Sequence, residues 1–271
     1  MTKIKNNYSL YYYSTAETLL KILGGGDKIQ IKYSDFNKSN DPKERLLYRH
    51  FQSGDIPLDT DVAKEKIRNE YKYISFCRNE KSFLELKEST FPVMWAIYGS
   101  HQSKDNDDNQ TYMDGVCIEI DFDGLKQYVK SRKKDELILN KIRYIDSKKY
   151  LNLYSEKSMI TIDEDIIIKW NNWKYENEYR IIYNGEDEFL DITNFVERIY
   201  LGEDFRLYNV VELCKIMATK RYDTLTPSKF TKIIVNNYRR LDNINIIQAD
   251  MIEIIRKEHP DYYDFLVKNV K

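Results

Sequence analysis

The side chains best suited to chemistry in this 271-residue chain are two glutamates one residue apart, Glu176 and Glu178, with Arg180 close behind. We predict a single strand from Trp173 to Tyr183, in which side chains point alternately to the two faces of a sheet. The two faces would carry Trp173, Tyr175, Asn177, Tyr179, Ile181 and Tyr183 on one side and Lys174, Glu176, Glu178, Arg180 and Ile182 on the other. Two carboxylates beside cations can hold a ligand or catalyse a reaction, and they can equally form a charged, solvent-exposed strand face.

A second set of carboxylates lies on the segment from Gly115 to Asp123, where Glu119, Asp121 and Asp123 share one face of a predicted strand. Magnesium prefers oxygen ligands, so this face could hold a divalent cation. The alternative is a half-buried strand whose acidic residues face water.

The predicted elements indicate an α+β protein with a single domain over residues 1–271. Its sheet is expected to be mixed and largely antiparallel, whole or split, with flanking helices. A core of about residues 10–205 would be followed by an extension over 206–271, with the order helix, strand, strand, helix, packed on that core. The predicted strands are 10–13, 28–33, 73–77, 115–123, 138–145, 173–183, 199–201, 230–235 and 244–249, and the predicted helices include 93–98, 125–131, 162–170 and 208–218.

Two helix starts carry capping signals. Ser14 and Glu17 fit a capping box, in which the Ser14 hydroxyl and the Glu17 carboxylate each accept a hydrogen bond from a free backbone N–H group. Asp41 is the expected N-cap of a later helix that begins at Pro42.

The composition excludes several classes of protein. Lys and Arg number 43 against 44 Asp and Glu, which argues against a strongly electrostatic nucleic-acid binder. The three cysteines are far apart and lack histidine partners, so we predict neither a zinc site nor a disulfide framework. The N-terminus is polar, and no apolar run is long enough to span a bilayer. We therefore expect a cytoplasmic protein with no membrane partner.

The order of motifs resembles the bacterial family known as domain of unknown function 2971. The resemblance spans roughly residues 10 to 205. Its pieces are Leu10–Ser14, Phe36–Asn37, Asn40–Pro42, Ile74–Cys77, Met94–Tyr98, Gly115–Asp121, Lys169, Trp173–Arg180 and Tyr200–Gly202. Each piece is short, and the signal lies in finding all of them in this order.

The stretch Glu176-Asn177-Glu178 is also similar to the Glu-x-Glu element of ADP-ribosyltransferases, which split NAD between nicotinamide and ribose. The resemblance implies that NAD is the substrate and that no metal takes part. Glu178 would contact the ribose and catalyse, because a carboxylate stabilises the positive charge that develops there. Glu176 would orient the nucleophile.

The same resemblance assigns residues that bind NAD. The N-terminal motif around Tyr12, Tyr13 and Ser14 stands where such enzymes hold the adenosine side, with Tyr12 at a position that usually carries His or Arg. Other side chains implied to line the cleft are Trp95, Tyr98, Asn40, Asp41 and Arg180. For the two aromatics the alternative is core packing, and for Asn40 and Asp41 it is helix capping.

Four hypotheses follow. The first is an ADP-ribosyltransferase-like toxin or phage-defence effector that modifies a nucleic acid or a protein, or hydrolyses NAD, and that works with a neutralising or sensing partner. The second is a non-catalytic module that binds a nucleotide, a nucleic acid or a phage protein through stacked tyrosines and Arg180. The third is a metal-dependent nuclease that uses Glu119 and Asp121 with the glutamate pair. In the fourth, Arg180 pairs with the glutamates in a purely structural network.

Overall fold

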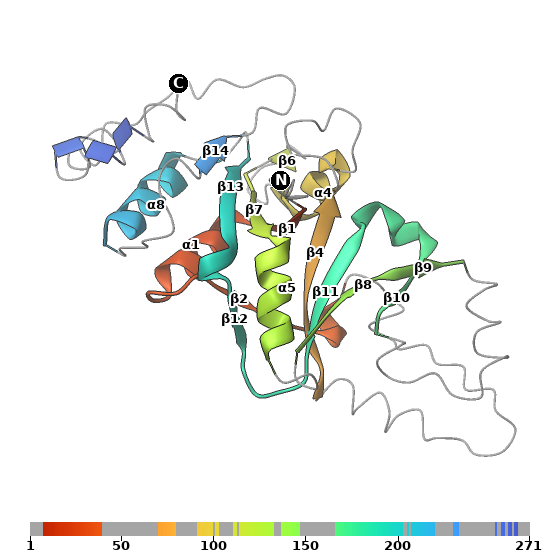
Figure 1. Ribbon diagram of the computed structural model, residues 1–271. Helices are drawn as coiled ribbons and strands as arrows, with labels where there is room; N and C mark the ends of the chain where they lie inside the picture. The colour runs from red at the N-terminus through yellow and green to blue at the C-terminus, as the bar shows by residue number, and fades with distance from the viewer. Residues whose placement is uncertain are drawn as a thin grey trace, which may run out of the picture. The chain divides into compact units, whose positions relative to one another are not determined.

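The structure, a computed structural model, is an α+β protein with mostly antiparallel sheets, as the sequence predicts (Figure 1). It describes residues 8–39, 70–79, 91–99, 101–102, 111–112, 114–132, 137–146, 166–202, 205, 207–219 and 230–232, with a few positions between 253 and 264. Asn40, Asp41 and the predicted strand 244–249 lie outside these residues.

The chain divides into two compact units, each built from separate stretches of sequence. The first unit comprises Met1–Ile31, Glu80–Phe122 and Asp191–Lys271, and the second comprises Lys32–Asn79 and Asp123–Leu190. The chain passes between the two units four times, after Ile31, Asn79, Phe122 and Leu190. Strands β2 (Gln30–Lys32) and β12 (Phe189–Asp191) pair in a two-stranded sheet. The single domain expected from the sequence stays a prediction.

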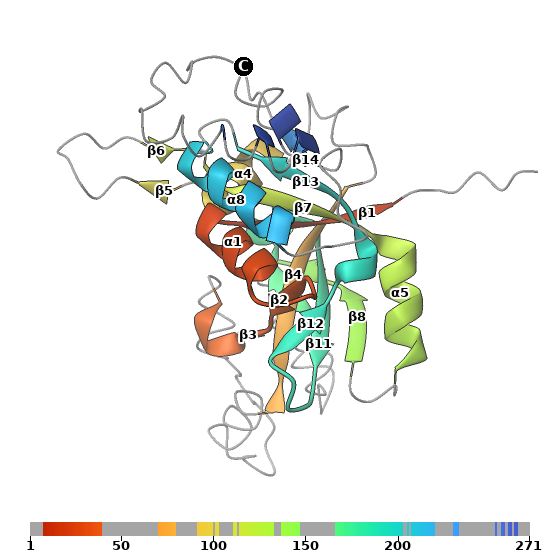
Figure 2. The same cartoon turned by 90° about the vertical axis from the view of Figure 1, so that its left-hand side faces the viewer.

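The first unit contains four neighbouring strands in the order β14, β13, β7, β1. Their bounds are Phe230–Lys232 for β14, Val196–Leu201 for β13, Val116–Asp121 for β7 and Ser9–Ser14 for β1. Strand β7 pairs antiparallel with β1 and with β13, and the three lie side by side in Figure 2. The strand predicted over 115–123 is confirmed for Val116–Asp121, but Phe122 and Asp123 belong to helix α5 (Phe122–Ser131) instead. Val116, Ile118 and Ile120 are fully buried as predicted, but so is Cys117, so burial alternates only from Ile118 onward.

The helices whose full bounds the structure describes in the first unit are α1 (Ala16–Gly24), α4 (Phe91–Tyr98) and α8 (Leu207–Thr219). Helix α1 packs against α8 (Figure 1), and α4 packs on β1. The predicted capping box is wrong by one residue: the N-cap is Thr15, whose hydroxyl accepts a hydrogen bond from the Thr18 N–H. Glu17 instead forms an ion pair with Lys21 one turn further on.

Three short elements also lie in the described part of the first unit. Strands β5 (His101–Gln102) and β6 (Thr111–Tyr112) form a two-stranded sheet, and the 3-10 turn η4 spans Thr193–Phe195.

The second unit is organised around strand β11. The strand order is β3, β4, β11, β8, all antiparallel, with bounds Ser34–Asp35, Lys72–Asn79, Glu178–Tyr183 and Leu137–Lys141. Beside them lie a parallel pair, β9 (Arg143–Ile145) with β10 (Ile168–Trp170), and the 3-10 turns η1 (Phe36–Lys38) and η3 (Asn171–Glu176). Helix α5 spans Phe122–Ser131, beginning at the last residue of the first unit.

Three predictions for the second unit are wrong. The strand predicted over 138–145 is two strands, because β8 ends at Lys141 and β9 begins at Arg143. The segment from Trp173 to Tyr183 is not one strand, because η3 occupies its first part and β11 begins only at Glu178. The helix predicted over 162–170 is also wrong at its C-terminal end, where Ile168–Trp170 forms β10. A short continuous apolar run such as Ile166–Ile168 does not distinguish a buried strand from a helix, so pairing with β9 decides.

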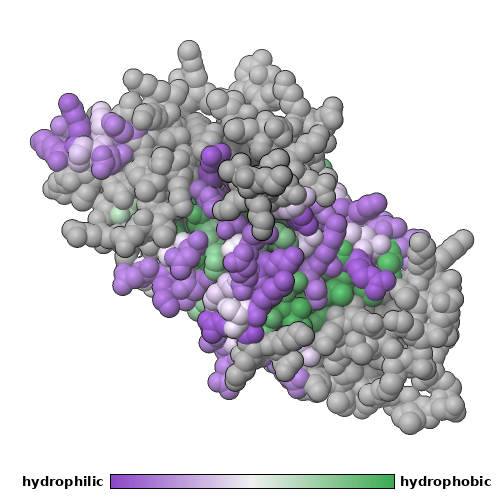
Figure 3. Space-filling view, in the orientation of Figure 1, coloured by the Kyte–Doolittle hydropathy of each residue, from purple (hydrophilic) through white to green (hydrophobic). Residues whose placement is uncertain are grey.

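One face of the molecule is largely polar where its residues are described (Figure 3). Hydrophilic side chains predominate where the described residues reach the face seen in Figure 3, with smaller hydrophobic areas between them. No helix in the described part of the chain has the length and apolar composition that crossing a bilayer requires.

Candidate functional site

The candidate site forms where η3 gives way to β11. Glu176 is the last residue of η3 and Glu178 is the first of β11. Between them, Asn177 adopts the left-handed conformation, with φ 41° and ψ 51°. Strand β10 precedes η3 directly and supplies Lys169.

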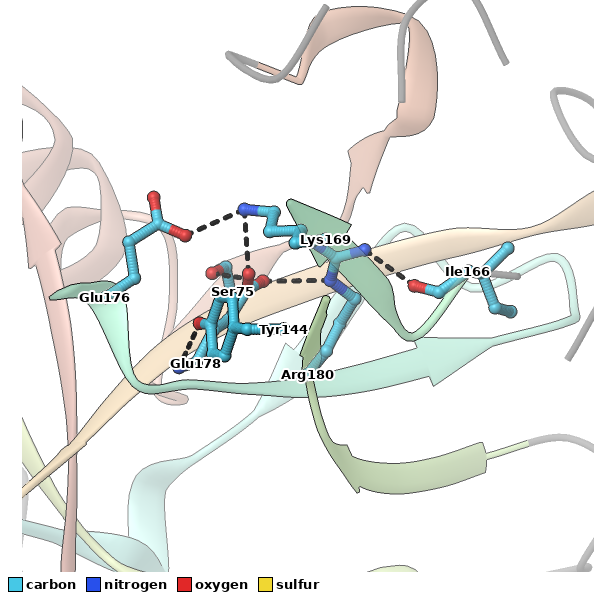
Figure 4. A network of polar contacts seen from close by, with 7 residues as sticks. All are labelled: Ser75, Tyr144, Ile166, Lys169, Glu176, Glu178 and Arg180. Carbon is cyan, nitrogen blue, oxygen red and sulfur yellow. Dashed lines mark hydrogen bonds and ion pairs between the residues drawn. The ribbon is translucent and has the colours of Figure 1, made fainter. Parts of the chain in front are cut away.

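Lys169 and Arg180 neutralise the two carboxylates (Figure 4). The Lys169 Nζ lies 2.8 Å from Glu176 Oε2 and 2.8 Å from Glu178 Oε2, so one ammonium bridges both glutamates. Arg180 Nε donates to Glu178 Oε1 at 2.9 Å, and Ser75 Oγ donates to the same oxygen at 2.6 Å. Glu178 therefore has an ion pair or a hydrogen bond on each of its carboxylate oxygens.

A second layer of contacts fixes these groups. The Glu178 N–H donates to the Tyr144 hydroxyl at 2.8 Å, and Arg180 Nη1 donates to the carbonyl oxygen of Ile166 at 2.8 Å. The Arg180 guanidinium lies 4.5 Å from the centre of the Tyr73 ring. Such cation–π contacts stabilise a desolvated guanidinium.

All four charged side chains are removed from water. Glu178 and Arg180 are 0% exposed, Glu176 is 3% exposed and Lys169 is 5% exposed. Glu176, Glu178 and Arg180 of the predicted charged face are thus part of the core, whereas Lys174 is exposed. The alternative of a solvent-exposed face is wrong for these three residues. The two carboxylates and the two cations balance one another in charge, and buried charges in proteins are normally paired in this way.

The network keeps Glu178 ionised. Burial alone raises the pKa of its carboxyl, but the charges of Arg180 and Lys169 and their hydrogen bonds outweigh that effect and lower the pKa to about 2. Burial and the neighbouring Glu178 carboxylate raise the pKa of the Tyr144 hydroxyl, which therefore keeps its proton.

The aromatic candidates lie in the first unit. Trp95 of α4 is buried and meets the Tyr13 ring edge to face, with ring centres 5.7 Å apart. Tyr12, Ser14 and Tyr98 are half-buried. The burial of Trp95 agrees with the core-packing alternative, and its ring still faces one of the predicted site residues.

Glu119 is engaged by two tyrosines. Its Oε2 accepts a hydrogen bond from the Tyr200 hydroxyl at 2.6 Å, and its Oε1 accepts one from Tyr11 at 3.3 Å. Within the described residues, no group of three or more His, Cys, Asp or Glu side chains is placed to hold a metal ion. This network could not be predicted from the sequence, because it depends on β7 lying between β1 and β13.

The structure brings together three of the residues that the sequence singled out, Glu176, Glu178 and Arg180. It adds Ser75 and Tyr144, which sequence reasoning missed, because each comes from a different strand and carries no local motif. Lys169 was noted only as part of the family resemblance, and its bridging position between the carboxylates was not foreseen.

Comparison of the chain with protein-family models, with curated proteins and with solved structures found no match. The resemblances described above therefore stay predictions.

Proposed function

We propose that the protein is an ADP-ribosyltransferase-like enzyme that uses NAD as its substrate. The observation that carries the proposal is the convergence of Glu176 and Glu178 on one point, where both carboxylates contact a single ammonium at 2.8 Å. A point at which two carboxylates stabilise one positive charge suits a reaction whose transition state is cationic.

The chemistry assigns a role to each glutamate. When the bond between the ribose and nicotinamide breaks, positive charge develops on the ribose. Glu178, which its low pKa keeps ionised, stabilises that charge, and Glu176 orients the group that attacks the ribose. The Lys169 ammonium occupies this point in the structure, so its side chain must swing away before the ribose can reach Glu178.

Arg180 contacts Glu178 on the buried side of the site. Its guanidinium is 0% exposed and is engaged by Glu178 and by the Ile166 carbonyl. We therefore assign it to holding Glu178 in place. In this proposal the NAD-binding contacts come from Tyr12, Tyr13, Ser14, Trp95, Tyr98, Asn40 and Asp41.

The proposed biological setting is a toxin or a phage-defence effector. The acceptor of ADP-ribose would be a nucleic acid or a protein, or water if the enzyme hydrolyses NAD. A neutralising or sensing partner would control such an activity.

A non-catalytic binding module is the second candidate, and one observation favours it. Glu178 is 0% exposed and already paired with two cations, so in this conformation it presents no free carboxylate to a ligand. Such a module would bind NAD or a related nucleotide and leave it intact.

Nicotinamide release separates the two candidates. The full-length protein is incubated with NAD, and free nicotinamide is measured by chromatography while NAD binding is measured by calorimetry. The enzyme proposal expects release by the wild type and a loss of at least about 100-fold in Glu178→Gln, a size typical for removal of one stabilising group. The matched control is Glu188→Gln, which changes an exposed glutamate of the same unit.

If the wild type binds NAD but releases no nicotinamide, the result favours the binding module. Equal rates in Glu178→Gln and Glu188→Gln would contradict the catalytic role of Glu178.

A further inference from the structure

We infer that Asn177 is a positioning residue for the glutamate pair, and that it acts through its left-handed backbone conformation. The inference rests on the proposed function and extends it to a residue that the proposal does not use. Asn177 would touch no substrate. It would set the distance and direction between the carboxylates of Glu176 and Glu178.

The conformation of Asn177 is unusual. Among the described residues it is the only one other than glycine with a positive φ. Left-handed backbone is unfavourable for side chains with a Cβ atom, and asparagine tolerates it better than most. Specific contacts must therefore hold Asn177 in the left-handed conformation between the two glutamates.

Three hydrogen bonds hold the turn. The Asn177 N–H donates to the Lys174 carbonyl at 3.2 Å, which closes η3. The Arg78 N–H donates to the Asn177 carbonyl at 3.1 Å, and the Asn177 side-chain amide donates to the Arg78 carbonyl. Since Cys77 pairs with Glu178, these bonds continue the contact between β4 and β11 by one residue.

The turn decides how the carboxylates meet. On an uninterrupted strand, residues two apart point the same way with their backbones about 6.7 Å apart. Here Glu176 belongs to a 3-10 turn and Glu178 to a strand, and their carboxylates nevertheless share the Lys169 ammonium. A residue that disfavours positive φ at position 177 would change the backbone conformation between η3 and β11, and it would thereby move Glu176 relative to Glu178.

The test compares Asn177→Gly with Asn177→Ala. Both lose the side-chain amide, and they differ by one methyl group, but only glycine adopts positive φ without strain. We expect nicotinamide release by Asn177→Gly to stay within about threefold of the wild type. In Asn177→Ala kcat should fall about 10- to 100-fold with KM for NAD nearly unchanged, because small displacements of reacting groups cost rate rather than ground-state binding.

A second readout does not depend on activity. Lys169 is shielded by the two glutamates, whereas Lys174 and Lys141 of the same unit are exposed. Brief acetylation followed by mass spectrometry measures how accessible each lysine is. Lys169 should stay protected in the wild type and in Asn177→Gly and become several-fold more reactive in Asn177→Ala. Lys174 and Lys141 serve as internal references, and thermal unfolding verifies that each variant is folded.

The outcomes separate this inference from the proposed function. If the wild type releases no nicotinamide, the proposed function fails, and Lys169 protection alone decides the role of Asn177. Equal kcat values and equal Lys169 protection in the glycine and alanine variants would overturn the inference. The inference would also be overturned if Asn177→Gly lowered kcat and exposed Lys169 to acetylation as much as Asn177→Ala does. That result would assign the effect to the side-chain amide, which both variants lack.

Discussion

At Glu178 the free-energy cost of burying a carboxylate is offset by Lys169, Arg180 and Ser75 together. Removing one partner from such a network usually destabilises the fold strongly, because the remaining charges stay buried. Glu178 is 0% exposed, so its substitution should cost stability as well as activity.

We therefore expect Glu178→Gln to lower the free energy of unfolding by about 3 kcal/mol. Urea unfolding followed by circular dichroism measures the difference. Glu188→Gln, at an exposed position, should stay within about 0.5 kcal/mol of the wild type. If both variants were as stable as the wild type, the ion pairs of Glu178 would contribute nothing measurable to stability.

The same carboxylate predicts a dependence of stability on pH. Its folded pKa of about 2 lies below the ordinary value of 4.5, so the unfolded state binds more protons between these values. The stabilisation is complete above about pH 4.5 and is lost as the pH falls toward 2. Urea unfolding at pH 6, 4 and 3 should show a steeper decline for the wild type than for Glu178→Gln. Parallel declines would mean that Glu178 titrates at its ordinary pKa in the folded protein.

Among the elements, helix α1 offers a clean test of local structure. Thr15 is its N-cap, and its hydroxyl accepts a hydrogen bond from the backbone of Thr18. Thr15→Ala should lower the free energy of unfolding by about 1 kcal/mol, and Thr15→Ser, which keeps the hydroxyl, should cost much less. Urea unfolding measures both. A larger loss in the serine variant than in the alanine variant would show that the hydroxyl does not cap the helix.

Strong local patterns predicted several elements correctly. The alternation in Val116–Asp121 identified β7, and the helical spacing of apolar residues identified α8. The prediction of one strand from Trp173 to Tyr183 was wrong because the alternation of charged and aromatic residues there also fits a 3-10 turn followed by a strand. Asn177 carried the only local sign of the break, since asparagine is among the residues that tolerate positive φ.

The candidate site was only partly predictable for a related reason. Glu176, Glu178 and Arg180 lie within five residues of one another and could be grouped from spacing alone. Ser75 and Tyr144 reach Glu178 through pairing of strands that are distant in the sequence, and long-range pairing leaves no local signal.

At the scale of the whole molecule, neither unit is a continuous piece of chain. The second unit takes β4 from Lys32–Asn79 and β11 from Asp123–Leu190. In a fragment of residues 123–190, β11 would lose its antiparallel neighbour β4, and Glu178 would lose the hydroxyl of Ser75.

We expect this fragment to show no cooperative unfolding and no slow amide exchange in β11. Hydrogen exchange measured by mass spectrometry on the fragment and on the full chain provides the comparison. Equal protection of β11 in both would show that the second unit does not need its first segment.

The central claim, that Glu178 acts on NAD, is tested most directly by single-turnover nicotinamide release with the enzyme in excess. Under these conditions the measured rate reports on chemistry, and the variants are compared at a temperature where each is folded. We predict release by the wild type and by Glu188→Gln at similar rates, with a rate at least about 100-fold lower in Glu178→Gln. Release by Glu178→Gln at the wild-type rate would contradict the account, as would the absence of any release by the wild type.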